Sequence, residues 1–291
     1  MPEAGAAREQ RQARAREWAA APVPALARGR AQAPEQAKAL ADELLGRLRA
    51  LADPAHAAGM ARYGISPVGT LGVSMTTLRS IAAEQRQLRR AQPEVAHQAA
   101  ARLWASGVHE ARLLAALLDV PVLVTREQAD AWVADLDSWD TCDQLQHLVA
   151  ATSFADEAVA AWVGGDDEFV RRAGLVLVCT LAVHDKRAPD ERIVALLRLV
   201  ESAADDERPS VSKAVSWALR QVGKRSSACH AAAVAAAERI LTTHPGSRGA
   251  RWAGRDALRE LGSEAVRTRL RLVGPDQEAQ EERALGTGRR G

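Results

Sequence analysis

Apolar residues recur at helical spacing along most of the chain. They repeat every three or four positions, so that they share one face of a helix. The segments are Ala39–Leu51, Met75–Gln87, Glu94–Ala105, Glu110–Val120, Arg126–Leu136, Asp143–Ala151, Glu157–Val163, Glu168–Val183, Glu191–Val200, Val211–Val222, Ala231–Leu241 and Arg251–Leu261. Turn residues separate them, as in SGVHE, GGDDE, DKRAPD and THPGSRG. Convincing strand-like alternation is absent from the sequence, so the pattern predicts an all-α protein.

Helices joined by such short loops are too small to bury their apolar faces one by one. Helical pairs stacked on a shared core solve this problem, which predicts an α-solenoid, or superhelix, of HEAT-like helical repeats. We expect this repeat domain at residues 37–272. Residues 1–36 are rich in Ala and Arg and lack the apolar region of a secretory signal, which predicts a disordered or loosely helical arm. A disordered tail is expected at residues 273–291.

The composition narrows the classes of function. Of the 291 residues 47% are hydrophobic but only 3% are aromatic, so the core must consist mainly of Ala, Leu and Val. The three cysteines, Cys142, Cys179 and Cys229, lie in apolar helical patterns and are expected to be reduced core residues of a cytoplasmic protein. The seven histidines show no ligand spacing, and no apolar run could span a bilayer. We therefore expect no metal, no cofactor and no membrane partner.

Positive charge gathers on particular helices although the formal net charge is only +2. Arg171 and Arg172 open the helical segment FVRRAGLVLVCTLAV, and Lys213, Arg220 and Lys224 follow in SVSKAVSWALRQVGK. A single arginine of this kind usually belongs to a solvated helix face. As a set, these residues predict a stripe that binds phosphate groups. The series continues with Arg225, Arg248, Arg251 and Arg255.

The stretch DLDSWDTCDQL, residues 135–145, combines four aspartates with a tryptophan. Asp137 or Ser138 could cap the helix that follows, and acidic residues in a first turn are stabilised by the helix dipole. Trp139 and Asp143 are four residues apart and therefore share one helical face. Taken alone, such a Trp is more often core and such an Asp solvated. Together with the basic helices downstream, the pair predicts a binding site.

Several segments carry a resemblance to a known family. They are MARYGI at residues 60–65, GVSMTTLRSIA at 72–82, HEARLLAALL from His109, SWDTCD, EFVRRAGLVL at 168–177 and SKAVSWALRQVGK at 212–224. In this order and spacing the sequence resembles the AlkD-type DNA alkylation repair glycosylases, which are built of HEAT-like repeats. The resemblance extends from about residue 40 to about residue 261.

The resemblance implies roles for particular residues. Asp143 matches the catalytic carboxylate, and Trp139 and Trp217 match the aromatic walls of the family's cleft. Arg172 matches an arginine that holds the DNA backbone. The pattern of positive charge, independently of the resemblance, makes Arg171, Lys213 and Arg220 further candidates for binding DNA. The chain departs from the family at Arg208-Pro209-Ser210, where bulkier apolar residues are expected. This departure and the Arg-rich arm leave the substrate range open.

The proposed chemistry follows from these residue types. Alkylation of a purine at N3 or N7 makes the base cationic, so that it leaves as a neutral molecule without a general acid. Positive charge then develops on the deoxyribose, as in glycoside hydrolysis. Asp143 can stabilise this charge and hold the attacking water, a contact worth about 3–4 kcal/mol. Each of the two tryptophans can add about 0.5–2 kcal/mol by cation–π contact.

The sequence therefore predicts a DNA glycosylase, a hydrolase of N-glycosidic bonds. Its partner would be duplex DNA that contains N3-methyladenine, N7-methylguanine or a similar lesion. We expect a monomer in the bacterial cytoplasm, associated with the nucleoid when it acts, that does not excise neutral lesions such as uracil. Two alternatives stay open: a noncatalytic HEAT-like protein that binds damaged or structured DNA, and a protein-interaction scaffold.

Overall fold

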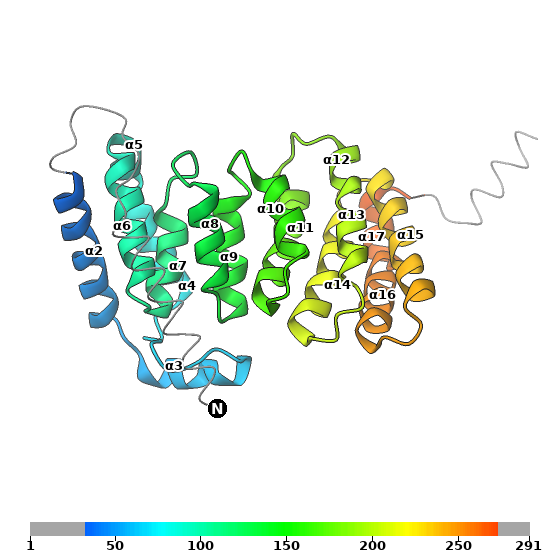
Figure 1. Cartoon of the computed structure of the whole chain (residues 1–291), viewed down its shortest axis with the longest axis horizontal. Coiled ribbons are helices and arrows are strands. Elements are labelled where there is room, and N and C mark those ends of the chain that lie inside the picture. Colours follow the sequence, from blue (N-terminus) through cyan, green and yellow to red (C-terminus); the bar gives the residue numbers. More distant parts are fainter. Residues whose placement is uncertain (1–32, 273–291) are drawn as a thin grey trace, which may run out of the picture. The chain divides into compact units, whose positions relative to one another are not determined.

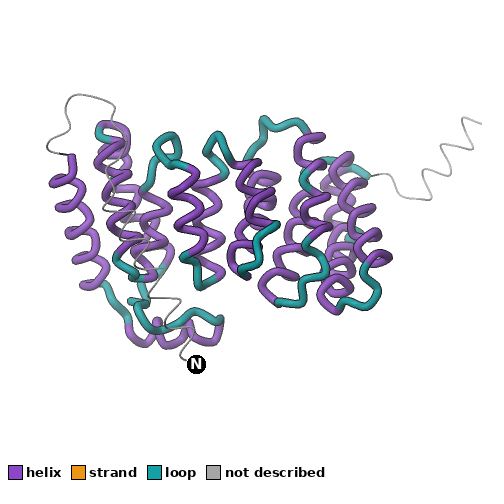
Figure 2. The backbone as a smooth tube through the Cα atoms, in the orientation of Figure 1, coloured by secondary structure: helices purple, strands orange, loops and turns teal. Residues whose placement is uncertain are grey.

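The computed structural model describes residues 33–272, which consist of helices joined by loops (Figure 2). No strand occurs in this part of the chain. The predicted tail at 273–291 lies outside the described residues, as does the predicted arm except for residues 33–36, which are helical. Contacts divide the chain into two compact units, Met1–Thr180 and Leu181–Gly291. Each unit is described by itself.

The first unit is a succession of helices that pack side by side. Among them, α2 packs against α6, α6 against α7, and α7 against both α4 and α9 (Figure 1). The elements are α2 (Ala33–Ala50), α3 (Pro54–Met60), the 3₁₀ helix η1 (Ala61–Tyr63), α4 (Met75–Glu84), α5 (Arg86–Ala91), α6 (Pro93–Ala105), α7 (His109–Leu118), α8 (Arg126–Ala134), α9 (Trp139–Val149) and α10 (Ala155–Val163). Helix α11 (Glu168–His184) begins in this unit and ends in the second.

Two tryptophans anchor the core of the first unit. Trp104 of α6 and Trp132 of α8 are buried, and their rings stack with centroids 4.3 Å apart and an interplanar angle of 3°. The indole nitrogen of Trp104 donates to Oδ2 of Asp135 at 3.1 Å, which satisfies its polar edge. Around them the buried side chains are mainly Ala, Leu and Val, as the composition predicts.

The second unit is built in the same way. Helix α14 packs against α15 and α16, and α15 also packs against α16. The elements are α12 (Asp190–Ala195), α13 (Leu197–Ser202), α14 (Pro209–Gly223), α15 (Ser227–Thr243), α16 (Arg248–Leu261) and α17 (Glu264–Leu270). The buried Gly249 lets the start of α16 approach the backbone at Asp206, because a Cβ at this position would lie 2.5 Å from the Asp206 carbonyl oxygen.

The sequence signals at the helix starts are present as capping contacts. Ser226 accepts a hydrogen bond from the amide of Cys229 at 3.1 Å, and Ser247 accepts one from Ala250 at 3.1 Å. Pro209 is the first residue of α14, a position where its missing N–H costs nothing. The Arg208-Pro209-Ser210 departure is therefore a helix start.

The predicted burial of the cysteines is confirmed, since Cys142, Cys179 and Cys229 all lie in the core. Burial raises the pKa of the Cys142 thiol far above its ordinary value, so this side chain stays protonated. Within residues 33–272, none of the helices combines the length and the apolar character that crossing a membrane requires.

Candidate functional site

Helix α9 begins within the acidic stretch. Ser138 has extended backbone angles, φ −148° and ψ 153°, and its carbonyl accepts the first intrahelical bond from Cys142 at 3.2 Å. Of the two N-cap candidates, Ser138 thus occupies the position. Its hydroxyl donates to Oγ1 of Thr141 at 3.0 Å instead of capping a backbone amide. The helix start places Trp139 in the first turn and Asp143 one turn later on the same face.

The Trp139 side chain is held by one hydrogen bond and is otherwise partly exposed to solvent. Its indole Nε1 donates to the backbone carbonyl of Tyr63 at 3.0 Å, which ties α9 to the end of η1. The residue is nevertheless 42% exposed, unlike the fully buried Trp104. An exposed indole with a fixed orientation is suited to stacking on a base or to contact with a cation.

Asp143 and Arg172 form an ion pair between α9 and α11. Nη2 of Arg172 donates to Oδ1 of Asp143 at 2.8 Å, and the side chains are 8% and 23% exposed respectively. Part of the carboxylate therefore faces solvent while the guanidinium is almost covered. Burial raises the pKa of Asp143, and the nearby positive charge of Arg172 opposes this rise without cancelling it.

The sequence HEAR, residues 109–112, forms the first turn of α7. Its histidine connects this turn to the start of α9. His109 Nε2 lies 2.8 Å from Oδ2 of Asp140, the residue after Trp139. Burial lowers the pKa of His109, but the hydrogen bond and charge of Asp140 outweigh it and leave the pKa raised. Burial conversely raises the pKa of Asp140, and the contact with His109 brings it below its usual value.

The two other polar residues of this sequence fix the surrounding loops. Glu110 is buried and accepts hydrogen bonds from the amides of Leu71 at 2.8 Å and Gly72 at 2.7 Å. Gly72 has φ +83°, and a Cβ there would lie 2.1 Å from the carbonyl oxygen of Asp53. Only glycine fits this position. Arg112 donates from Nη2 to Oδ2 of Asp135 at 2.6 Å.

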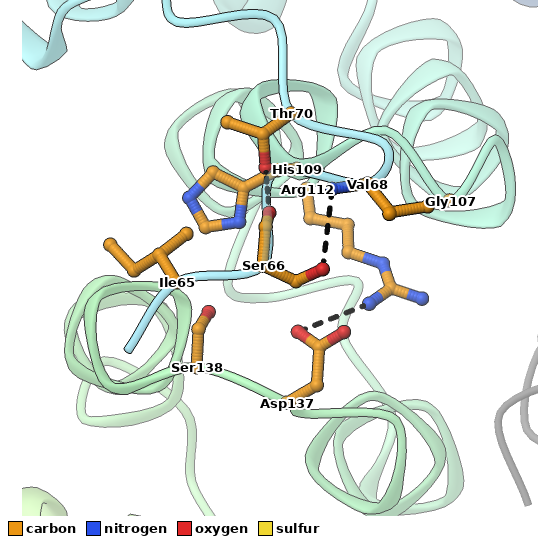
Figure 3. A pocket seen from close by; sticks show the side chains of 9 residues that line it. All are labelled: Ile65, Ser66, Val68, Thr70, Gly107, His109, Arg112, Asp137 and Ser138. Carbon is orange, nitrogen blue, oxygen red and sulfur yellow. Dashed lines mark hydrogen bonds and ion pairs between the residues drawn. The ribbon is translucent and has the colours of Figure 1, made fainter. Parts of the chain in front are cut away.

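A small polar pocket lies beside the start of α9 (Figure 3). Its wall is formed by the loop of residues 65–70, by His109 and Arg112 of α7, and by Asp137 and Ser138. Nη1 of Arg112 lies 3.9 Å from Oδ1 of Asp137, so the pocket contains charges of both signs close together. The pocket thus adjoins the N-cap of α9, but Trp139, Asp143 and Arg172 are not among the residues that line it.

Arg171, adjacent to Arg172, contacts its own helix start. Its Nε donates to the carbonyl of Gly165 at 2.9 Å, and the side chain is half-buried. This contact fixes the loop that precedes α11. Its binding to DNA stays a prediction.

The remaining predicted residues lie on α14 in the second unit. Trp217 is half-buried and Lys213 is exposed. Arg220 is engaged with α16, because its Nη1 donates to Oε2 of Glu260 at 2.6 Å. Nζ of Lys224 binds the other oxygen of the same carboxylate at 2.6 Å. The basic stripe predicted on α14 is therefore partly neutralised, and the DNA-binding roles of its residues stay predictions.

Several residues of the site were not singled out from the sequence. His109 and Asp140 support the first turn of α9, and the carbonyl of Tyr63 holds Trp139. In the sequence, both segments were noted only because HEAR and MARYGI contribute to the family resemblance. The resemblance did not indicate which contacts their residues make. Among residues 33–272, no group of three or more His, Cys, Asp or Glu side chains is placed to hold a metal ion.

Comparisons with known proteins agree with the helical-repeat fold described above. One solved structure belongs to a new family of proteins related to the HEAT-like repeat DNA glycosylases, with affinity for branched DNA structures. It matches with a TM-score of 0.55 and 18% identity, over 68% of this chain and 81% of that one. At this identity the likeness shows the fold alone, and it confirms the predicted all-α HEAT-like repeat fold.

The family follows from the sequence itself. The sequence model of the DNA alkylation repair enzyme family matches residues 44–261, which is more than half of the chain. The protein belongs to this family, and the resemblance seen in the sequence is confirmed. No curated protein matches the chain.

Proposed function

We propose that the protein is a DNA glycosylase that hydrolyses the N-glycosidic bond of cationic alkylated purines in duplex DNA. The observation that carries this proposal is the Asp143–Arg172 pair with the exposed Trp139 one helical turn away. A carboxylate, a guanidinium and an open aromatic face are the groups that this chemistry needs. Family membership supports the same reading.

Asp143 stabilises the positive charge that develops on the sugar as the base departs. Burial raises the pKa of Asp143, and the Arg172 guanidinium lowers it. The pair therefore favours the ionised carboxylate. Because Arg172 pairs with Asp143, an arginine that holds the DNA backbone at this position would bring the carboxylate close to the nucleotide. The arrangement thus joins the DNA backbone to the catalytic carboxylate.

Trp139 contributes the selectivity for charge. Its ring is fixed through Nε1 and remains exposed, so that a cationic nucleotide can contact the indole without being enclosed in a pocket. A neutral base gains little from such a contact and also leaves with difficulty, because the proposed mechanism includes no general acid. The proposed enzyme therefore acts on bases that are already positively charged.

The test of this function is the release of free base from two duplexes of equal sequence, one with N7-methylguanine and one with uracil. We expect release of N7-methylguanine in a single turnover and no release of uracil. Rapid release of uracil would contradict the charge-based mechanism. Binding to both duplexes without release of either base would contradict glycosylase activity.

A second candidate function is binding of branched DNA without catalysis. It is favoured by the solved structure with the same fold, which belongs to a family with affinity for branched DNA structures. Binding to a four-way junction and to a linear duplex of equal length separates the candidates. Strong preference for the junction, combined with no base release, would support this second function.

A further inference from the structure

Helix α16 repeats the pattern of basic and aromatic residues found on α14. In both helices a basic residue is followed after four positions by Trp, after seven by Arg and after eleven by another basic residue. Residues at this spacing share one helical face. The first set is Lys213, Trp217 and Arg220 of α14 with its C-cap Lys224, and the second, on α16 at a constant offset of 35 residues, is Arg248, Trp252, Arg255 and Arg259. We call the second set the α16 stripe.

The two helices differ in how much of their positive charge is compensated. Arg220 and Lys224 of α14 share Glu260, each at 2.6 Å. Nε of Arg220 also lies 3.7 Å from Oδ2 of Asp256. Both carboxylates come from α16, so α16 supplies the negative charge that partly neutralises α14. Exposed positive charge remains on Lys213 of α14 and on the arginines of α16.

The α16 stripe is exposed along its whole length. The side chains of Arg248 and Arg259 are 86% and 77% exposed. Nε of Arg248 lies 3.6 Å from Glu207, whose carboxylate also accepts from the Arg248 backbone amide at 2.8 Å, and Arg259 donates to Asp256 within its own helix. Arg255 is exposed and has no hydrogen bond or ion pair within residues 33–272. Surface pairs as open as these contribute little to stability.

Trp252 stands in the middle of these cations and is 45% exposed. The opposite face of α16 is buried through Ala250, Ala253, Ala257 and Leu261. Trp252 is thus outside the core, although burying a tryptophan is among the larger gains available to a fold. An exposed aromatic between cations is typical of surfaces on which a nucleic-acid base stacks while basic side chains hold phosphates.

We propose that the α16 stripe binds the DNA backbone, with Trp252 stacked on a base that an end, a gap or a branch exposes. From Arg248 to Arg259 the stripe measures about 16 Å at 1.5 Å per residue. This length corresponds to roughly five base pairs of duplex at 3.4 Å per pair. The proposal rests on the DNA binding of the proposed function but not on its chemistry. It adds a contact to undamaged DNA that the lesion does not determine.

The test measures affinity of the full chain for undamaged DNA, as a blunt duplex and as the same duplex with a single-stranded overhang, across a range of salt concentrations. The variant replaces Arg248 and Arg255 by Ser. Its control replaces Arg187 and Arg198, two exposed arginines of the same unit, by Ser. Both variants lose the same charge, and thermal unfolding verifies that they fold.

Each phosphate contact adds about 0.9 to the slope of log affinity against log salt concentration. The α16 variant should reduce the magnitude of the slope by about 1.8, and the control should leave it near the wild-type value. Trp252→Ala should lower affinity for the overhang about tenfold with a smaller effect on the blunt duplex, and Trp252→Phe should restore most of it.

Equal slopes and affinities for the α16 variant and the wild type would overturn the inference. If base release is normal in that case, the proposed function is unaffected and only the inference fails. Absence of any DNA affinity in the wild type would overturn both. A loss of self-association on sedimentation with unchanged DNA affinity would assign the stripe to contacts between copies and would also overturn the inference.

Discussion

At the scale of single residues, the proposed role of Asp143 predicts how excision should depend on pH. The reaction needs the ionised carboxylate, and burial raises its pKa above the ordinary value of 3.8. Single-turnover excision should therefore rise with pH through this raised pKa and be lost as pH falls below it. The profile of release of N7-methylguanine, which is cationic throughout this range, measures it. An acid limb at the ordinary carboxyl value or below would contradict the assignment.

Replacing Arg172 by Ala should move this acid limb to higher pH. The guanidinium lowers the pKa of Asp143, so its removal leaves burial unopposed. Arg79→Ala, which removes an exposed arginine from α4, is the matched control and should leave the limb in place. A limb that stays unchanged in Arg172→Ala, with only weaker DNA binding, would show that the two side chains act independently.

The types of the site residues could be predicted from the sequence, but their partners could not. Helical spacing alone placed Trp139 and Asp143 on one face, as the structure has them. The same reasoning grouped Arg220 with the phosphate-binding residues. Its carboxylate partner, Glu260, is 40 residues further along, and only the packing of α14 on α16 brings them together. Charge patterns within one helix do not contain this information.

At the scale of elements, the contact between α7 and α9 should make stability depend on pH through His109. Asp140 raises the pKa of His109, so its stabilising contribution is fully present below the unfolded value of 6.5. The contribution is lost as pH rises through the folded pKa. His109→Gln should cost about 1–3 kcal/mol, as for a lost buried hydrogen bond.

Chemical denaturation at pH 6 and pH 8 measures this effect. The difference in unfolding free energy between wild type and His109→Gln should be larger at pH 6. His230→Gln provides a control, because within residues 33–272 the His230 ring hydrogen-bonds to the carbonyl oxygen of Leu261, at 3.1 Å, and to no carboxylate. A difference that is equal at both pH values would mean that the pair is held without charge on His109.

The helices themselves could largely be predicted, and the exceptions are short elements. Every segment with sustained helical periodicity is helical, because burial of one face determines both the pattern and the structure. Helices α3 and α17 are too short to show a period. The segment 75–87 is divided at Gln85, where ψ is 3°. The N-cap candidate Ser138 predicted the start of α9 correctly. The apolar periodicity alone would have placed this start four residues later, at Asp143.

At the scale of the whole molecule, the resemblance assigns one aromatic wall of the family's cleft to Trp217, which lies on α14. Trp217→Ala should slow excision of N7-methylguanine by about 2- to 30-fold, the equivalent of 0.5–2 kcal/mol of cation–π contact. Trp217→Phe should keep most of the activity. Single-turnover rates at saturating enzyme measure the effect, and an unchanged rate in the Ala variant would remove this residue from the mechanism.

The central claim is that Asp143 makes this protein a glycosylase, and one comparison tests it most directly. Release of N7-methylguanine from duplex DNA is measured in a single turnover for the wild type and for Asp143→Asn, which keeps the shape and removes the charge. The account predicts release by the wild type and a loss of roughly a hundredfold or more in the variant, with DNA binding retained. Equal rates for the two proteins, or no release by either, would contradict it.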